Sequence, residues 1–169
     1  MKKLLACLLA AFIIFTSFSF AQPQTSSVTA SATIQTPISF GTKQNLSFGN
    51  LYPNQSKSIP TTDNSNCGKW QIFGEINRSI SVTFSNLPSS LTDSYSNSLS
   101  LSYSNNDAGY ANIDGSTQTT FHPNDGATIN LGSNGRAFLY IGGTVSASQN
   151  QTPGVYSGTI TITVNYVGS

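Results

Sequence analysis

Histidine is the side chain most often used for acid–base chemistry near neutral pH, and this chain has one, His122. A Ser-His-Asp triad would place it beside a nucleophile and an acid. The G-x-S-x-G turn that exposes a nucleophilic serine is absent from the sequence. His122 lies in "FHPNDG", where Pro123, Asn124 and Gly126 favour a turn. We therefore expect a turn residue here, no catalytic residues, and a protein that is not an enzyme.

Carboxylates are the next candidates for chemistry, but the acidic residues are isolated from one another along the chain. They are Asp63, Glu75, Asp93, Asp107, Asp114 and Asp125. The segment "NNDAGYANIDG", Asn105 to Gly115, gathers oxygen ligands yet lacks the regular acidic spacing and closing Glu of a calcium loop. We interpret it as a turn and leave ion binding there open. Zinc would find at most His122 and Cys67 as ligands, too few for a structural site, so we expect no metal and no cofactor.

Aromatic side chains could instead form a flat surface on which sugar rings stack. The candidates for such a ligand-binding surface are Trp70, Tyr95, Tyr103 and Tyr110. Trp70, however, leads an apolar strand, and this position favours the core of a sandwich. A self-contained module that binds carbohydrate or a host surface is therefore kept as an alternative function.

The elements that would position these side chains follow the two-residue period of β-strands. Alternating or apolar runs occur at Trp70–Ile76, Ser79–Phe84, Leu99–Tyr103, Thr128–Leu131 and Ala137–Val145. Turn formers such as "NLPSS", "SNNDAG" and "GSNG" separate them. No stretch of ten residues after Gln22 has helical period and composition. The pattern predicts an all-β antiparallel sandwich.

The two ends of the predicted domain carry the clearest alternation. Near its start, residues 28–35 alternate and predict a first strand or a strand donated to a neighbour; the apolar members are Val28, Ala30, Ala32 and Ile34. At its end, residues 155–167 predict a last strand with an apolar row of Tyr156, Ile160, Ile162, Val164 and Tyr166. We expect the last strand to pair with the run Ala137–Val145 at the centre of the sandwich. An upstream segment, "NLSFGNLYPN", should turn Leu46, Phe48 and Leu51 inward.

The first residues have the layout of a secretory signal peptide. Lys2 and Lys3 precede an apolar run from Leu4 to Phe15, and a small-residue cut site ends at Ala21. We expect residues 1–21 to be removed, leaving residues 22–169 as a single β-sandwich domain, exported through the periplasm to the surface or exterior of a bacterium. Contact with a membrane is expected through export alone.

Cleavage after Ala21 would remove Cys7 and leave Cys67 without an intramolecular disulfide partner. A buried thiol, an intermolecular bridge and a bound adduct all remain open for Cys67. Charged residues make up 8 % of the chain and form no basic patch, which argues against nucleic-acid binding. Solubility must then come from Ser, Thr, Asn and Gln.

Two stretches together resemble a known family. "LSFGNLYPN" and "YIGGTVSASQNQTPGVYSGTITITVNY", with the early strand "ATIQTPI" from Ala32 to Ile38, are similar to the bacterial secreted family called domain of unknown function 4402. That family is in turn similar to pilin and adhesin sandwiches of the immunoglobulin type, including spore-coat-U-type secreted pilus proteins. The resemblance implies an exported surface protein without catalytic residues.

In pilins of this type a neighbour's N-terminal extension fills a groove beside the last strand by β-augmentation. The resemblance thus implies Val28 to Ile34 as the donor and Tyr156 to Tyr166 as a wall of the groove. Cys67 departs from the pilin pattern because it has no disulfide partner. We expect a secreted structural or fimbria-like subunit that assembles with itself or with related surface subunits, and a glycan or host surface as partner in the alternative.

Overall fold

The structure, a computed structural model, describes residues 23–168. The predicted signal peptide, residues 1–21, lies outside the described residues. The chain divides into two compact units, residues 1–33 and residues 34–169. In the first unit, residues 23–33 form no strand and all their side chains are exposed. The first strand of the second unit begins at Ser39, and the pairing of residues 28–35 with a sheet stays a prediction.

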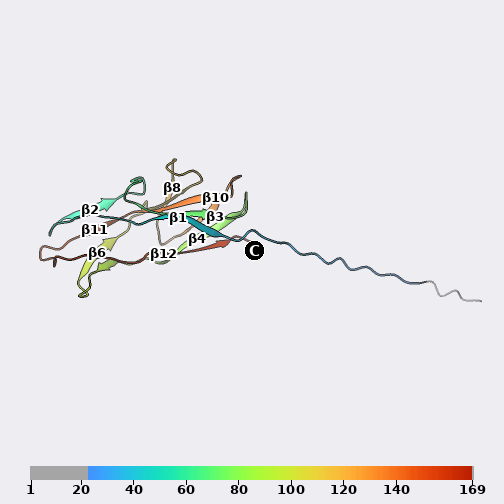
Figure 1. Cartoon of the computed structure of the whole chain (residues 1–169), viewed down its shortest axis with the longest axis horizontal. Helices are drawn as coiled ribbons and strands as arrows, with labels where there is room; N and C mark the ends of the chain where they lie inside the picture. The colour runs from blue at the N-terminus through green and yellow to red at the C-terminus, as the bar shows by residue number, and fades with distance from the viewer. Residues whose placement is uncertain (1–22, 169) are drawn as a thin grey trace, which may run out of the picture. The chain divides into compact units, whose positions relative to one another are not determined.

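The second unit is an all-β antiparallel sandwich built from three sheets (Figure 1). Its strands are β1 Ser39–Gln44, β2 Ser56–Ile59, β3 Gly68–Phe73, β4 Ser79–Asn86, β5 Ser90–Thr92, β6 Ser98–Ser102, β7 Ala108–Ala111, β8 Thr119–Phe121, β9 Ala127–Asn130, β10 Arg136–Ile141, β11 Gly143–Ser146 and β12 Thr161–Tyr166. Sheet A has the order β1-β3-β10-β7-β8, sheet B the order β2-β11-β6-β5, and sheet C the order β12-β4-β9. Residues 23–168 contain no helix that could span a membrane.

The core is organised around β10, which is buried on both faces. Ala137 and Leu139 pack into a first cluster with Ile80 and Ile129, so this face of sheet A lies against sheet C. Phe138 and Tyr140 point the opposite way, into a second cluster. A third cluster in sheet B, described below, makes the floor of a groove. The sequence run "RAFLYI" is apolar at successive positions because neither face of β10 meets water.

Alternation located several strands correctly. The predicted runs at Ser79–Phe84, Leu99–Tyr103 and Thr128–Leu131 correspond to β4, β6 and β9. In β12 the side chains of Ile162, Val164 and Tyr166 are half-buried while the residues between them are exposed, as predicted. The prediction of a single turn at Asn105–Gly115 is wrong, because β7 runs through its middle and pairs with β10 and β8.

The predicted partner of the last strand is also wrong. β12 pairs with β4 and lies at the edge of sheet C, so it is not a central neighbour of the run 137–145. The reason is that this run has neighbours on both sides: β10 pairs with β3 and β7, and β11 pairs with β2 and β6. β12 also begins at Thr161, later than predicted. The residues ahead of it, 155–160, make one isolated bridge, between Ser157 and Thr92 of β5.

Gly142 divides the predicted strand Ala137–Val145 into β10 and β11 and carries the chain from sheet A to sheet B. Its backbone N–H donates to the carbonyl oxygen of Asp107 at 2.7 Å, outside either ladder. A Cβ atom at this position would collide with the backbone carbonyl of Ile59, on the edge strand of sheet B. The junction of the two sheets therefore depends on the absence of a side chain.

We expect Gly142→Ala to lower the free energy of unfolding by about 1–3 kcal/mol, because backbone atoms must move to admit the methyl group. Denaturant-induced unfolding gives the measurement. Gly154→Ala is the matched control, since the nearest atom to its Cβ is a carboxylate oxygen of Asp93 at 3.1 Å, a contact that a shift of a few tenths of an ångström relieves. Equal losses in the two variants would contradict the tight junction at Gly142.

Candidate functional site

The sandwich unit has a groove with a volume of ≈ 1110 Å³. Its walls are two irregular segments, residues 45–53, which follow β1 directly, and residues 151–160. Between the walls, strands of sheet B supply the floor with Leu91, Leu99, Leu101 and Val145, and Ala147 follows directly after β11; Trp70 of sheet A lines the groove as well. Figure 1 shows the chain that leads into β12 running as an irregular segment in the half that holds β2, β6 and β11.

The floor is the third hydrophobic cluster. Leu99, Leu101 and Val145 are buried at 8 %, 3 % and 1 % exposure. Half-buried side chains from both walls pack against these three residues: Phe48 and Leu51 from one wall and Tyr156 from the other. The first cluster is enclosed by two sheets, whereas this one is covered from above by two irregular segments with a groove between them. An apolar floor under an open groove favours an apolar occupant.

The wall at residues 45–53 has unpaired backbone groups. Ser47 donates its N–H to Asn66 O at 2.9 Å, and Tyr52 donates to the side chain of Gln55 at 3.2 Å. Between these anchors, the backbone N–H and C=O groups of residues 48–51 have no partner within residues 23–168. Such a row can accept another strand.

The opposite wall repeats this arrangement. Ser157 exchanges two backbone hydrogen bonds with Thr92, each 2.9 Å long, which directs its peptide groups toward β5. The backbone groups of Gly158 and Ile160, which flank Thr159, have no backbone hydrogen-bond partner in the described part of the chain. Further along, Val167 donates to Ser79 O at 2.9 Å, so by alternation Ile162 and Val164 direct their peptide groups away from β4. One open edge thus runs from Gly158 to Val164.

Side-chain hydrogen bonds hold the second wall in place. The Tyr156 hydroxyl donates to Thr152 O at 2.6 Å and accepts from Gln151 Nε2 at 2.8 Å. Gln151 Nε2 also donates to Ser98 O, at 3.0 Å, which fastens the wall to β6. At the loop end, Asn54 donates to Ser148 O and Ala147 donates to Gln55 O, joining the two walls. The groove is therefore preformed by bonds at its end and along one side.

The residues predicted for strand pairing fall into three places. Tyr156 and Ile160 line the groove. Ile162, Val164 and Tyr166 pack on the first core cluster instead. Val28 and Ile34, in the segment that precedes β1, are 94 % and 98 % exposed, and Ala30 and Ala32 between them are exposed as well.

The side chain of Tyr166 links the C-terminal end of β12 to two other segments of the chain. Its hydroxyl donates to Thr36 O at 2.7 Å and accepts from the backbone N–H of Glu75 at 2.7 Å. Residues 35–38 and Val164–Tyr166 line one shallow pocket of ≈ 400 Å³. The segment 35–38 therefore lies beside this end of β12, opposite the end at which the groove opens.

We expect Tyr166→Phe to lower the free energy of unfolding by about 1–2 kcal/mol, because the backbone groups of Thr36 and Glu75 each lose a partner. Thermal or denaturant unfolding measures the loss. Tyr95→Phe is the control, since Tyr95 is 85 % exposed and its hydroxyl has no bond within the described chain. A Tyr166→Phe variant as stable as Tyr95→Phe would show that this contact does not hold residues 35–38.

The four aromatic candidates for sugar stacking do not form one surface. Trp70 and Tyr110 pack on the first core cluster, where Trp70 stands edge-to-face to Phe84 with ring centroids 6.2 Å apart. Tyr103 packs on the third cluster. Burial, with a smaller contribution from Asp107, raises the pKa of Tyr103 to about 12. Tyr95 is exposed in a turn. The predicted stacking surface is therefore not assembled.

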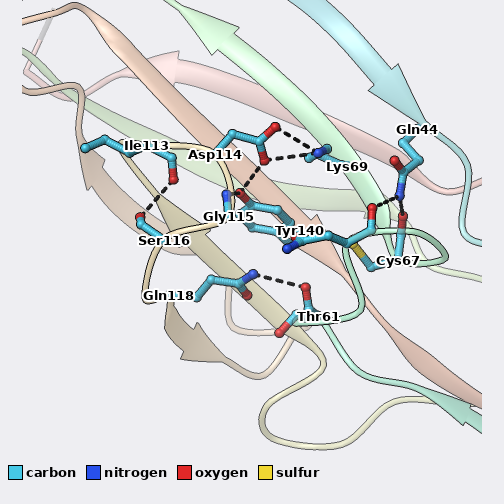
Figure 2. Close-up of polar contacts among 11 residues, drawn as sticks. Gln44, Thr61, Cys67, Lys69, Ile113, Asp114, Gly115, Ser116, Gln118 and Tyr140 are labelled. Carbon is cyan, nitrogen blue, oxygen red and sulfur yellow. Dashed lines mark hydrogen bonds and ion pairs between the residues drawn. The ribbon is translucent and has the colours of Figure 1, made fainter.

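A polar cluster lies apart from the groove, between β3, β10 and the loop after β7 (Figure 2). Lys69 Nζ lies 2.9 and 3.0 Å from the carboxylate oxygens of Asp114, and the Tyr140 hydroxyl donates to the same carboxylate at 2.9 Å. Burial acts to raise the pKa of Asp114, but the hydrogen bonds from Lys69 and Tyr140 outweigh it, so this pKa lies below its usual range. Burial, reinforced by Asp114, raises the pKa of Tyr140 to about 12.

This cluster fastens a loop rather than offering a reactive group. Gly115 N–H donates to the Tyr140 hydroxyl at 3.0 Å, and Gln118 donates to Thr61 O at 3.0 Å (Figure 2). His122, likewise, accepts from the N–H of Asn124 at 3.1 Å in the predicted turn. Within residues 23–168, no three His, Cys, Asp or Glu side chains gather to hold a metal ion.

Cys67 is fully buried in the second core cluster. Burial raises the pKa of its thiol, which lowers the fraction of reactive thiolate at neutral pH. Of the three interpretations that the sequence left open, the buried thiol fits this position, because a bridge to another chain would need an accessible sulfur.

We expect a chromogenic aromatic disulfide to react with native Cys67 roughly 100-fold or more slowly than with the unfolded chain, because the core must open first. The absorbance of the released thiolate gives both rates, at one pH and with and without denaturant. Ser94→Cys, at an exposed turn position, supplies an accessible thiol for comparison. Native Cys67 reacting as fast as that thiol would contradict its burial.

Comparison with known proteins bears on the sandwich unit. Residues 38–166 match the family model described as Domain of unknown function (DUF4402). The match spans β1 to β12 and therefore includes both walls and the floor of the groove. Among curated proteins, none matches this chain.

Proposed function

Because the chain belongs to the DUF4402 family, whose description assigns no activity, we propose its function from its geometry: a secreted, non-enzymatic structural subunit of the bacterial surface, of the fimbrial or adhesin kind. Copies of the chain are joined by β-strand pairing. Export rests on the signal peptide predicted at residues 1–21. The observation that carries the proposal is the segment from Val28 to Ile34.

This segment has the pattern of a strand, and residues 23–33 form no strand within their own unit. Its apolar side chains alternate with Thr and Ser, and the described structure leaves all of them exposed. Burying Val28 and Ile34 is worth about 1.5–3 kcal/mol each. An isolated strand does not hold its conformation in water, so the segment needs a sheet edge to pair with.

The sandwich unit offers such an edge. The peptide groups of Gly158 and Ile160 are unpaired in the described residues, and residues 48–51, whose peptide groups are unpaired as well, line the same groove. Pairing an extended segment with an exposed edge obtains affinity from backbone hydrogen bonds and specificity from alternate side chains. A structural subunit can use this pairing to form assemblies without any further binding site.

The side chains best suited to catalysis, the carboxylates and the histidine, make hydrogen bonds within their own turns. Asp63 and Asp93 accept hydrogen bonds from the backbone and side chains of their own turns, which lowers the pKa of each. His122 accepts a bond within its own turn. These contacts support a structural rather than an enzymatic role. The glycan-binding alternative is not advanced, because its four aromatic residues are dispersed.

We expect the mature chain, residues 22–169, to form assemblies whose size rises with concentration, and the double variant Val28→Asp, Ile34→Asp to be monomeric. Each charge would have to be buried at an apolar position, which should weaken assembly at least about 10-fold per site. Sedimentation velocity over a range of concentrations gives the distribution of sizes.

The matched control is Thr29→Asp, Thr33→Asp, which adds the same charge to the opposite face of the same segment. We expect it to assemble, because this face points to solvent in a paired strand. A mature wild-type chain that stays monomeric at all concentrations, and binds no added peptide, would refute the proposed function.

A further inference from the structure

We propose that the outer face of sheet B binds the surface of ice crystals, through rows of hydroxyl groups that take the place of lattice water. This face consists of the outward side chains of β2, β5, β6 and β11, and every one of them is serine or threonine: Ser56, Ser58, Ser90, Thr92, Ser98, Ser100, Ser102, Thr144 and Ser146. The inference is independent of strand pairing, which uses other parts of the chain.

The direction of these side chains follows from the burial of the residues between them. Leu99, Leu101 and Val145 alternate with hydroxyl residues and are buried in the third cluster. Successive side chains of a strand point to opposite faces, so the serines and threonines point away from that cluster. Ser90 and Thr144 are half-buried, and the other members of the face are exposed. The buried side of sheet B holds the strands in place and thereby fixes the positions of the hydroxyl groups.

The register of the strands arranges the hydroxyl residues in rows across sheet B. Residues that stand opposite one another on neighbouring strands belong to the same row. The rows are Ser58 with Thr144 and Ser102; Ser56 with Ser146, Ser100 and Ser90; and Ser98 with Thr92. The second row crosses all four strands of the sheet. A two-dimensional array of hydroxyl groups therefore covers this face.

The spacing of the array is similar to that of a water lattice. Neighbouring strands lie about 4.7–4.9 Å apart, and alternate residues of an antiparallel strand lie about 6.8 Å apart. Both spacings are close to oxygen–oxygen repeats on a prism face of hexagonal ice. A hydroxyl group donates one hydrogen bond and accepts others, as a water molecule does. Each residue of the array can thus occupy a water position in the first layer of ice.

Most of the hydroxyl groups are available for such contacts. Ser56 Oγ and Ser146 Oγ are hydrogen-bonded to each other at 2.8 Å, and Ser102 Oγ donates to Thr144 O at 3.4 Å. The hydroxyl groups of the remaining members have no partner within residues 23–168. Serine and threonine are short, so holding them in one conformation costs less entropy than holding long polar side chains.

The composition of the face disfavours the other common kinds of partner. Protein partners are anchored mainly by Trp, Tyr or Arg, nucleic acids by cationic side chains, and calcium ions by carboxylates. A glycan would stack on an aromatic ring. The outward side chains of sheet B include no aromatic and no charged residue. Such a face matches ordered water best, and the export proposed above would bring it into extracellular water, where ice can grow.

Sheet C provides a matched comparison within the same unit. Its outer face also carries hydroxyl groups, with Thr163 opposite Thr83. Asn165 stands among them, however, and the register shifts between Thr161 and Ile162. The rows of sheet C are therefore less regular than those of sheet B, and we assign ice binding to sheet B alone.

The test measures the growth of ice grains in a frozen thin film that contains the full mature chain, residues 22–169. We expect the wild-type chain to inhibit this growth. The double variant Ser100→Tyr, Ser146→Tyr should need at least about a 10-fold higher concentration for the same inhibition, because two rings at the centre of the face hold ice away from the neighbouring hydroxyl groups. Tyrosine is favoured in strands, so the sheet should be retained.

Two further variants serve as controls for the tyrosine pair. Thr83→Tyr, Thr163→Tyr places the same rings on sheet C and should leave inhibition unchanged. Ser100→Thr, Ser146→Thr keeps both hydroxyl groups on sheet B and should retain inhibition.

Strand pairing and folding are separated from ice binding by additional chains. The variant Val28→Asp, Ile34→Asp, designed to prevent strand pairing, should still inhibit grain growth. Where the tyrosine pair does not fold, as judged by denaturant-induced unfolding, Ser58→Lys, Ser102→Lys at the ends of the first row replaces it, with the same expected loss. A folded wild-type chain that does not slow grain growth, or that slows it equally after the substitutions on sheet B, would overturn ice binding at this face.

Discussion

The double-sided burial of β10 is the constraint on which the rest of the sandwich depends. One face packs against sheet C, and the other carries Phe138 and Tyr140 into the second cluster. β10 pairs with β3 on one side and with β7 on the other, so the segment that follows β10 finds no free edge beside it and leaves sheet A after Ile141. Gly142 makes that exit and starts sheet B through β11. Figure 1 shows β2, β6 and β11 of sheet B toward the opposite end of the unit from β4 and β12 of sheet C, and the third cluster is covered by two irregular segments. The groove thus follows from the burial of both faces of β10 and the pairing of both its edges.

The edges of the sheets differ in how they are protected. An exposed edge strand is commonly blocked by a charged side chain, above all lysine, which disfavours pairing with another chain. One edge strand of sheet A, β1, carries Lys43, and one edge strand of sheet B, β2, carries Lys57. The edge from Gly158 through β12 carries no charge, and the edge strand β8 at the far side of sheet A is three residues long. Among the edges that residues 23–168 form, the other uncharged edge strands, β5, β8 and β9, are three or four residues long, so the edge that borders the groove is the longest uncharged one.

Alternation in the sequence identified strands well but carried no information about their partners. The spacing of Ile80, Val82 and Ile129 placed β4 and β9, and that of Ile162 and Val164 placed β12. The same pattern could not show that β12 pairs with β4, because partner choice depends on which edges are already occupied. β7 was missed because Asn, Asp and Gly around it are the residues of turns. The break at Gly142 was missed because an apolar run continues across it.

The candidate site was predicted only in part, because alternation identifies single strands and not how they are arranged around a groove. Tyr156 and Ile160 stood out by alternation, and Leu46, Phe48 and Leu51 were expected to point inward. The floor could be recognised as strand residues, but not as a floor, because the segments that cover it, residues 45–53 and 151–160, form no strands and carry no alternation that links them to sheet B. The segment from Val28 to Ile34 has a further property that bears on the groove: a shift of one residue would turn Thr29, Ser31 and Thr33 toward the apolar floor. Its larger apolar residues also stand at the two ends, with Ala30 and Ala32 between them. In the proposed pairing, a shift of two residues would place an alanine at one end position, so the placement of the larger apolar residues favours one register over its neighbours.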